Sequence, residues 1–342
     1  MAKAATHQAP AGLDRLRGQL DKAGYAGLLL TSPTGRRYAT APGSADATAV
    51  LLTTDGTVAS AIGGLSAATA AALHATGVAD GVVATEADLP PDVLGPAAGT
   101  GVRLRPAADL VFAELACCEP GELPAFAAAA DLAAVGYTAV MDHLRVGMDV
   151  RELSGNVDRS VRRAGGLLGW YDPYGADGAA GTDLVTVRGH DPATARLTAA
   201  TPLRYVLHPL LDGAAGYAAA TAVLSKADGP LRTAGDVCAA ATAALLASLR
   251  PGARLTDGYA AFEREAGEHG AASRLVALRG GGASLPLRTD STVVAEPGMV
   301  LGVRTEVQVP GRGAVELAET VVLTAEGAEP RAGTPLRLVE LY

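Results

Sequence analysis

An alanine-rich stretch from residue 122 to residue 144 divides this 342-residue chain into two parts, and it most constrains how the chain can fold. Alanine at this density favours a long helix, and the turn Val146-Gly147-Met148 closes it. A chain of this length can bury two separate cores. The predicted division is a flexible tail at 1–12, an N-terminal domain at 13–115 and a C-terminal domain at 120–342.

Helical and strand-like patterns alternate on both sides of this stretch. In the first part, an amphipathic helix with Leu13, Leu16 and Leu20 on one face is followed by short apolar runs. In the second part, Asp149 can cap a helix, and glycine and proline separate the strand-like runs that follow. Three of these runs, at 184–189, 203–211 and 217–224, are expected to be neighbours in one sheet. The alternation predicts an α/β (α+β) fold class.

Composition and charge exclude several classes of protein. The formal net charge is −8 and no dense run of Lys and Arg occurs, which opposes binding to a nucleic-acid backbone. The three cysteines form neither a metal-binding clip nor a disulfide framework, which favours a reducing cytoplasm. No uninterrupted apolar run reaches the roughly 18 residues of a membrane helix. We therefore expect a soluble cytoplasmic protein that acts on a small molecule, with neither a nucleic-acid nor a membrane partner.

Three segments resemble those of one enzyme family. Residues 14–40 are similar to a helix followed by an apolar strand and an S-P-x-x-x-R-Y turn, and residues 145–153 are similar to a P-G-x-T-E-x-E-L helix start. Residues 295–330 resemble an E-P-G-M-V strand, a G-R-G-x-V loop and a D-T-V-x-V-T strand with its G-A-E-P turn. The chain is thereby identified as a divergent member of the creatinase/aminopeptidase P/prolidase/methionine aminopeptidase family, which has the pita-bread fold.

The resemblance implies an architecture and an assembly. A small N-terminal creatinase-like domain would contain a central sheet. The C-terminal pita-bread domain would contain a curved antiparallel sheet flanked by helices. Members of the family commonly pair through both domains, so a homodimer is expected.

The resemblance also implies where a metal centre would lie. The family holds two divalent metals with two Asp, one His and two Glu, which together generate a hydroxide nucleophile. In this chain the corresponding positions are taken by His208 or its neighbours, Ala220, Arg279 or its neighbour, Arg304 and Ala318. Permanently charged guanidinium groups repel a cation, so we expect no metal and no other cofactor. Two less favoured alternatives would hold a single metal ion in a new geometry. One lies between His208 and Asp212, and the other lies between Glu306 and Glu319.

Loss of the metal leaves an enzymatic function open, because creatinase in this family cleaves a C–N bond without metal and uses a histidine as acid and base. The resemblance places the matching histidine in a loop that contains His190, and His208 at the end of an apolar strand is the other candidate. A histidine can donate and accept a proton near neutral pH. The alternatives are that His190 is exposed in a turn and that His208 is a hydrogen-bonded core or rim residue.

Arginine in a former metal cavity is costly to bury unless carboxylates meet it. Glu306, Glu316 or Glu319 could pair with Arg279 and Arg304 and plug the site. A ligand carboxylate could bind to the arginines instead, and both alternatives remain open.

Aromatic residues make up only 4% of the chain, yet three of them gather between residues 170 and 174. They could line a substrate pocket, or they could cover the core or a dimer contact. The substrate-binding candidates are Arg279, Arg304, Trp170, Tyr171, Tyr174, Asp212 and Tyr217.

Taken together, the residues favour a metal-independent enzyme that hydrolyses or eliminates a small carboxylate-bearing metabolite by side-chain acid/base catalysis. The catalytic candidates are His190, His208, Glu306 and Glu319. A histidine would move the proton, a glutamate would orient a base or bind a cationic group, and the arginines would anchor the anion. The rival hypotheses are a non-catalytic pita-bread protein that serves as a binding or scaffold module, and a metal-dependent peptidase with a rearranged site.

Overall fold

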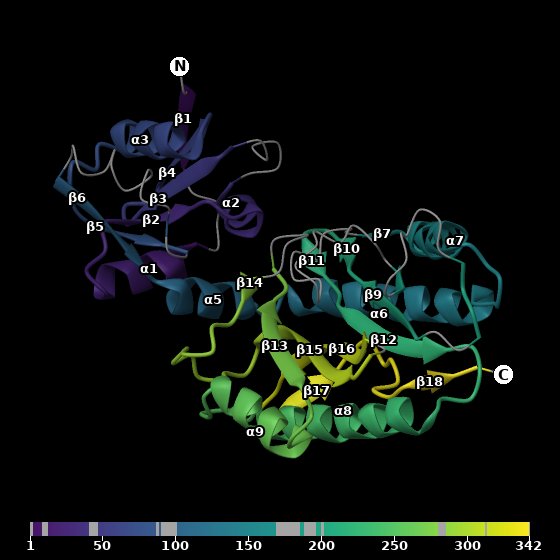
Figure 1. Ribbon diagram of the computed structural model, residues 1–342. Coiled ribbons are helices and arrows are strands. Elements are labelled where there is room, and N and C mark those ends of the chain that lie inside the picture. Colours follow the sequence, from purple (N-terminus) through teal and green to yellow (C-terminus); the bar gives the residue numbers. More distant parts are fainter. Residues whose placement is uncertain are drawn as a thin grey trace. The chain divides into compact units, whose positions relative to one another are not determined.

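The computed structural model describes residues 3–8, 13–40, 47–86, 89, 101–168, 185–187, 196–199, 202–279, 285–311 and 313–341. The chain forms two compact units, Met1–Glu114 and Leu115–Tyr342. Figure 1 labels the helices and strands of both units.

The N-terminal unit is built on a six-stranded sheet in the order β1-β4-β3-β2-β5-β6. Pairing is antiparallel from β1 through β4 and β3 to β2, and it is parallel from β2 through β5 to β6. The strands are β1 (Lys3–Gln8), β2 (Gly27–Leu30), β3 (Ala49–Thr53), β4 (Thr57–Ile62), β5 (Asp80–Thr85) and β6 (Gly101–Pro106).

Strand β1 corrects the expectation that residues 1–12 form a flexible tail. Residues Lys3–Gln8 pair antiparallel with the full length of β4. The run KAATHQ has neither the apolar alternation nor the aromatic content that marks a strand, so local sequence does not predict it. The otherwise open edge of β4 decides the pairing, because its backbone groups need partners.

Four helices are described in the N-terminal unit, and α2 begins at a side-chain cap. They are α1 (Asp14–Lys22), α2 (Pro33–Ala39), α3 (Leu65–Thr76) and α5 (Ala108–Ala116), the last of which continues into the second unit. Leu16 and Leu20 of α1 are fully buried, which confirms that the leucine spacing marks the inner face. Ser32 caps α2, where its Oγ accepts a hydrogen bond from the N–H of Gly35 at 2.9 Å.

The C-terminal unit contains a nine-stranded sheet whose main path is β14-β13-β15-β16-β12-β9-β8. Strand β17 pairs with β16, and β18 pairs with β12 in the only parallel contact among the described strands of this sheet. The strands are β8 (Val185–Val187), β9 (Leu203–Leu207), β12 (Ala218–Val223), β13 (Ala271–Ala277), β14 (Leu285–Pro286), β15 (Val300–Val309), β16 (Gly313–Leu323), β17 (Ala328–Pro330) and β18 (Val339–Glu340). A smaller sheet consists of β7 (Leu167–Leu168), β10 (Pro209–Leu211) and β11 (Ala214–Ala215). The adjacency of β8, β9 and β12 confirms that these runs are neighbours, except that residues 209–211 of the second run belong to the smaller sheet.

Two helix pairs pack against the larger sheet. Helix α6 (Leu123–His143) packs on α7 (Val150–Arg163) and contacts β9 and β12, whereas α8 (Gly229–Ser248) packs on α9 (Thr256–Ala266) and contacts β15 and β16. In Figure 1, α6 lies behind β9 and β12, and α8 lies below β15 and β16. Among the described helices, α6 alone has the length and hydropathy of a membrane span, and several of its residues, among them Ala130, Ala133 and Val140, are buried in the core of this unit.

Close packing explains why α6 and its neighbours are rich in small residues. A Cβ on Gly216 would lie 2.1 Å from the carbonyl oxygen of Ala129, and a Cβ on Gly136 would lie 3.1 Å from the side chain of Leu207. Larger side chains at these positions would push the helix away from the strands. The alanine-rich composition that marks the domain start is therefore a packing requirement of the fold.

Candidate functional site

Strand register brings together two of the positions that the resemblance assigns to metal ligands. Arg304 on β15 lies directly opposite Ala318 on β16, and Ala318 in turn lies opposite Ala219 on β12. Ala220, the expected counterpart of the second aspartate, is the next residue on β12, so its side chain points to the opposite face and lies in the core with Tyr205 and Leu207. The pattern of strands that would position a metal centre is therefore present, and the side chains at these places have changed.

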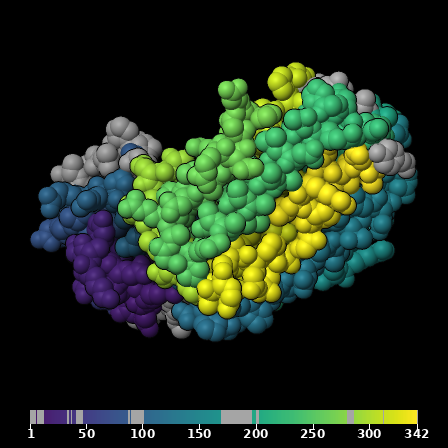
Figure 2. All heavy atoms as spheres, turned by 90° about the horizontal axis from the view of Figure 1, so that it is seen from below, coloured from purple at the N-terminus to yellow at the C-terminus, as the bar shows by residue number. Residues whose placement is uncertain are grey.

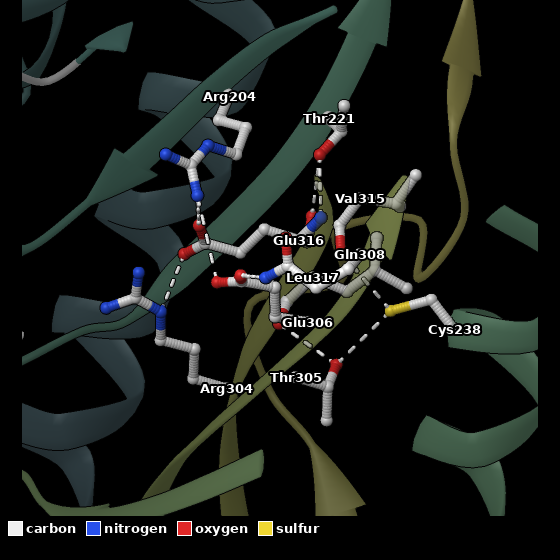
Figure 3. A network of polar contacts seen from close by, with 10 residues as sticks. All are labelled: Arg204, Thr221, Cys238, Arg304, Thr305, Glu306, Gln308, Val315, Glu316 and Leu317. Carbon is white, nitrogen blue, oxygen red and sulfur yellow. Dashed lines mark hydrogen bonds and ion pairs between the residues drawn. The ribbon is translucent and has the colours of Figure 1, made fainter. Parts of the chain in front are cut away.

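A group of four charged side chains occupies this part of the sheet, and we call Arg204, Arg304, Glu306 and Glu316 the Arg–Glu cluster. Figure 3 shows them converging from strands β9, β15 and β16. Arg304 Nε lies 2.7 Å from Glu316 Oε1, and Arg204 Nη1 lies 3.4 Å from Glu316 Oε2 and 3.7 Å from Glu306 Oε2. Two guanidinium and two carboxylate groups balance one another.

Burial makes this balance important for stability. Glu316 is 1% exposed, Arg304 is 7% exposed and Glu306 is 9% exposed. Glu306 and Glu316 are direct cross-strand partners, so their carboxylates would repel each other without the arginines. Burial raises the pKa of Glu306, and the charge of Glu316 raises it further, whereas the nearby arginines lower it.

The cluster faces away from helix α8. Thr305 lies between Arg304 and Glu306, and its Oγ1 is 2.7 Å from Oγ1 of Thr242 on α8. Alternate residues of a strand point to opposite faces of a sheet, so Arg304 and Glu306 point to the other face. Thr221 Oγ1 accepts a hydrogen bond from the N–H of Glu316 at 2.8 Å and fixes β12 beside it.

This donor set does not fit the divalent metals of the family. The carboxylates of Glu306 and Glu316 are engaged by guanidinium groups, and the resemblance assigns Arg304 itself to a ligand position. In the part of the chain that the structure describes, no group of three or more His, Cys, Asp or Glu side chains is arranged to hold a metal ion. The chemistry of the site is that of a closed set of ion pairs.

Glu319 lies in a different environment from the cluster. It is three residues beyond Glu316 on β16, so its side chain points to the opposite face. Its carboxylate accepts hydrogen bonds from the N–H groups of Thr320 at 2.9 Å and Ala332 at 2.6 Å, and from Thr334 Oγ1 at 3.2 Å. Glu319 therefore anchors the residues that follow β17, and the register keeps it apart from Glu306.

Burial raises the pKa of Glu319 to about 7 from an ordinary value of 4.5. The folded state consequently holds a proton that the unfolded chain releases between these two values, so stability falls as the pH rises from about 4.5 to about 7. The shift corresponds to a change in the free energy of unfolding on the order of 3 kcal/mol. Replacing Glu319 by Gln should reduce this pH dependence in urea unfolding at pH 5 and pH 8.

The exposed Glu326 provides the matched control for this prediction. Glu326→Gln makes the same chemical change at an exposed position, and the protein should keep the pH dependence that Glu319 causes. An unaltered profile in the Glu319→Gln protein would contradict the assignment.

His208 and Tyr217 form an aromatic contact near the smaller sheet. Their ring centroids are 4.3 Å apart with an interplanar angle of 34°, and both residues are buried. Tyr217 is fixed through its backbone, whose N–H donates to Thr320 Oγ1 at 2.7 Å. Asp212 is exposed in the turn between β10 and β11 with φ of 49°, a left-handed conformation that Asp tolerates better than most residues.

The second arginine at a ligand position, Arg279, is also paired within the chain. Its Nη2 donates to the carbonyl of Cys117 at 2.7 Å and forms an ion pair with Glu122, which precedes α6. The side chain of Glu122 is 41% exposed, so water screens this pair more than it screens the Arg–Glu cluster. The structure thus ties Arg279 to the start of α6 and not to the glutamates of β15 and β16.

Sequence reasoning missed Arg204, which is the fourth member of the cluster. The burial of β9 alternates, and Arg204 lies at a half-buried position of the strand. An isolated charge in the apolar run LRYVL was the available signal. The candidates His190, Trp170, Tyr171 and Tyr174 lie outside the described residues.

Comparison with known proteins agrees with this architecture. The sequence profile described as metallopeptidase family M24 matches residues 125–325. No curated protein matches the chain in sequence.

Several solved structures share the fold over almost the whole chain. The dipeptidase PepE from Mycobacterium ulcerans has a TM-score of 0.74 at 18% identity, covering 96% of this chain and 97% of that one. A recombinant prolidase from Thermococcus sibiricus has a TM-score of 0.71 at 12% identity, covering 97% and 98%. A Xaa-Pro dipeptidase from Bacillus anthracis has a TM-score of 0.67 at 19% identity, covering 96% and 99%. These likenesses confirm the predicted two-domain fold.

Proposed function

This chain belongs to metallopeptidase family M24, and from that premise we propose that it is a non-catalytic member that acts as a binding protein. The observation that carries the proposal is the ion pair between Arg304 and Glu316 at 2.7 Å, at a place where the family binds metal. A guanidinium in that position fills the space and repels a cation. The repulsion between unit charges about 4 Å apart is on the order of 4 kcal/mol at an effective dielectric constant of 20.

Pairing of both arginines within the chain supports a binding function over metal-independent catalysis. A catalytic version needs Arg279 and Arg304 available for a substrate carboxylate. Arg304 is paired with Glu316, and Arg279 is paired with Glu122. A ligand carboxylate would have to displace an existing ion pair, which reduces the affinity that it can gain.

Metal-independent acid/base catalysis is the second candidate function. The observation that favours it is the buried contact between His208 and Tyr217, since a histidine near a phenol can exchange a proton. Such an enzyme would hydrolyse or eliminate a small carboxylate-bearing metabolite.

Metal content and peptide hydrolysis test the proposal together. We expect purified protein, incubated with Mn²⁺, Co²⁺ or Zn²⁺ and then desalted, to retain no stoichiometric metal by mass spectrometry. We also expect it to release no proline from X-Pro dipeptides, the substrates that the name of the Bacillus anthracis relative indicates. Retention of about one or two metal equivalents with proline release would establish a metallopeptidase instead.

The metal-independent enzyme is distinguished by turnover in the presence of a chelator. The protein could cleave a dipeptide, or another substrate with a scissile C–N bond, in EDTA and lose this activity in His208→Gln. That result would contradict the binding function and establish metal-independent catalysis. The expected result is the absence of such cleavage.

A further inference from the structure

A pocket of about 380 Å³ lies in the C-terminal unit between α8, Tyr137 of α6 and the end of the chain. Gly235 and Asp236 of α8 form part of one wall, and residues 337–340 form the other. A Cβ on Gly235 would lie 2.8 Å from Cβ of Leu338, so the glycine permits this close approach. Figure 2 shows the yellow C-terminal residues running beside green residues of the α8 region on this face.

The pocket contains two cations and two anions, and only one pair of them is joined. Arg232 Nη2 lies 2.9 Å from Glu340 Oε1, and the same oxygen accepts the N–H of Ala227 at 2.7 Å. Arg337 and Asp236 are exposed and form no ion pair with another described residue. The pocket therefore offers one free positive group and one free negative group to a ligand.

Tyr137 adds a hydroxyl group beside Arg337. Tyr137 and Arg337 line the same pocket. Burial raises the pKa of Tyr137, whereas the neighbouring Tyr205 and the positive charge of Arg337 lower it. The ring of Tyr137 is supported by that of Tyr205, with centroids 6.0 Å apart, and Tyr205 is fully buried. A guanidinium and a phenol are both good donors to a carboxylate.

From these groups we infer that the pocket binds a small zwitterion of the size of a free amino acid or a dipeptide. The ligand carboxylate contacts Arg337 and the hydroxyl of Tyr137, and the ligand ammonium contacts Asp236. The charged lining residues sum to zero, which favours a zwitterion over a dianion such as inorganic phosphate. The inference rests on the proposed function, in which the chain binds and does not cleave.

Calorimetric titration of the full chain tests the inference. The probes are alanine, L-alanyl-L-alanine, its N-acetyl and C-amide derivatives, and inorganic phosphate. We expect the dipeptide to bind, and each modification to weaken binding about tenfold by removing one charge-assisted contact. In Asp236→Asn the N-acetyl group should no longer weaken binding, and in Arg337→Gln the C-amide should no longer weaken it.

Arg264→Gln and Glu263→Gln provide matched controls, because these exposed residues lie on α9 and do not line the pocket. Both should bind the dipeptide as the unaltered chain does. Four results would overturn the inference. The first is that neither alanine nor the dipeptide binds, and the second is that phosphate binds at least as tightly as the dipeptide. The third is that the control variants weaken dipeptide binding as much as the pocket variants do, and the fourth is that the N-acetyl and C-amide groups weaken binding equally in every variant. Circular dichroism checks that each variant is folded.

The outcomes separate this inference from the proposed function. If the chain retains no metal, cleaves no dipeptide and binds no zwitterion, the proposed function stands and the inference about the pocket is wrong. Metal-dependent hydrolysis removes the proposed function, whatever the pocket binds.

Discussion

Replacement of Glu316 by leucine is expected to lower the free energy of unfolding by about 3–5 kcal/mol. Glu316 is 1% exposed and contacts both Arg204 and Arg304, so its loss leaves one buried and one half-buried guanidinium group with one carboxylate. Urea unfolding followed by circular dichroism measures the change. The midpoint should fall at an unchanged slope, because the surface exposed on unfolding stays nearly the same.

Two further variants show whether the loss comes from uncompensated charge. Arg304→Met combined with Glu316→Leu should recover most of the stability, because the remaining Arg204 and Glu306 still balance each other. Glu306→Gln should cost less than about 1.5 kcal/mol, because the ion pair of that carboxylate with Arg204 is long, at 3.7 Å. A loss in Glu316→Leu no larger than that in Glu306→Gln would contradict the account of the cluster.

Local sequence signals predict much of the architecture correctly. Asp149 caps α7 as expected, since its Oδ1 accepts a hydrogen bond from the N–H of Arg151 at 2.8 Å. The leucine spacing of α1 and the strand-like runs that became β9 and β12 are also confirmed. These features depend on residues a few positions apart, so their signals lie within short segments.

The partners of the arginines could not be predicted because they depend on strand register. Glu306, Glu316 and Glu319 are all close to Arg304 in the sequence, yet the pairing of β15 with β16 brings only Glu316 against its Nε. The partner of Arg279 is 157 residues away. Strand alternation alone could have separated Glu316 from Glu319, because an odd spacing places their side chains on opposite faces.

Replacement of Glu114 by leucine is expected to destabilise the N-terminal unit by about 3 kcal/mol. Glu114 is fully buried at the end of this unit. Its carboxylate accepts hydrogen bonds from Arg15 Nε at 2.8 Å and Nη2 at 3.0 Å, and from the hydroxyl of Tyr38 at 2.6 Å. The substitution leaves a guanidinium and a phenol without this acceptor.

Hydrogen exchange measured by mass spectrometry locates the effect of Glu114→Leu. Amides of α1 and α2, which contain Arg15 and Tyr38, should exchange faster, while those of β15 and β16 should stay protected. Tyr38→Phe removes one neutral donor and should cost only about 1 kcal/mol. Faster exchange throughout the chain would contradict a local role for Glu114. Arg15 and Tyr38, from the family-like motif at 14–40, therefore hold a structural carboxylate, whereas positions that depart from the family pattern hold the Arg–Glu cluster.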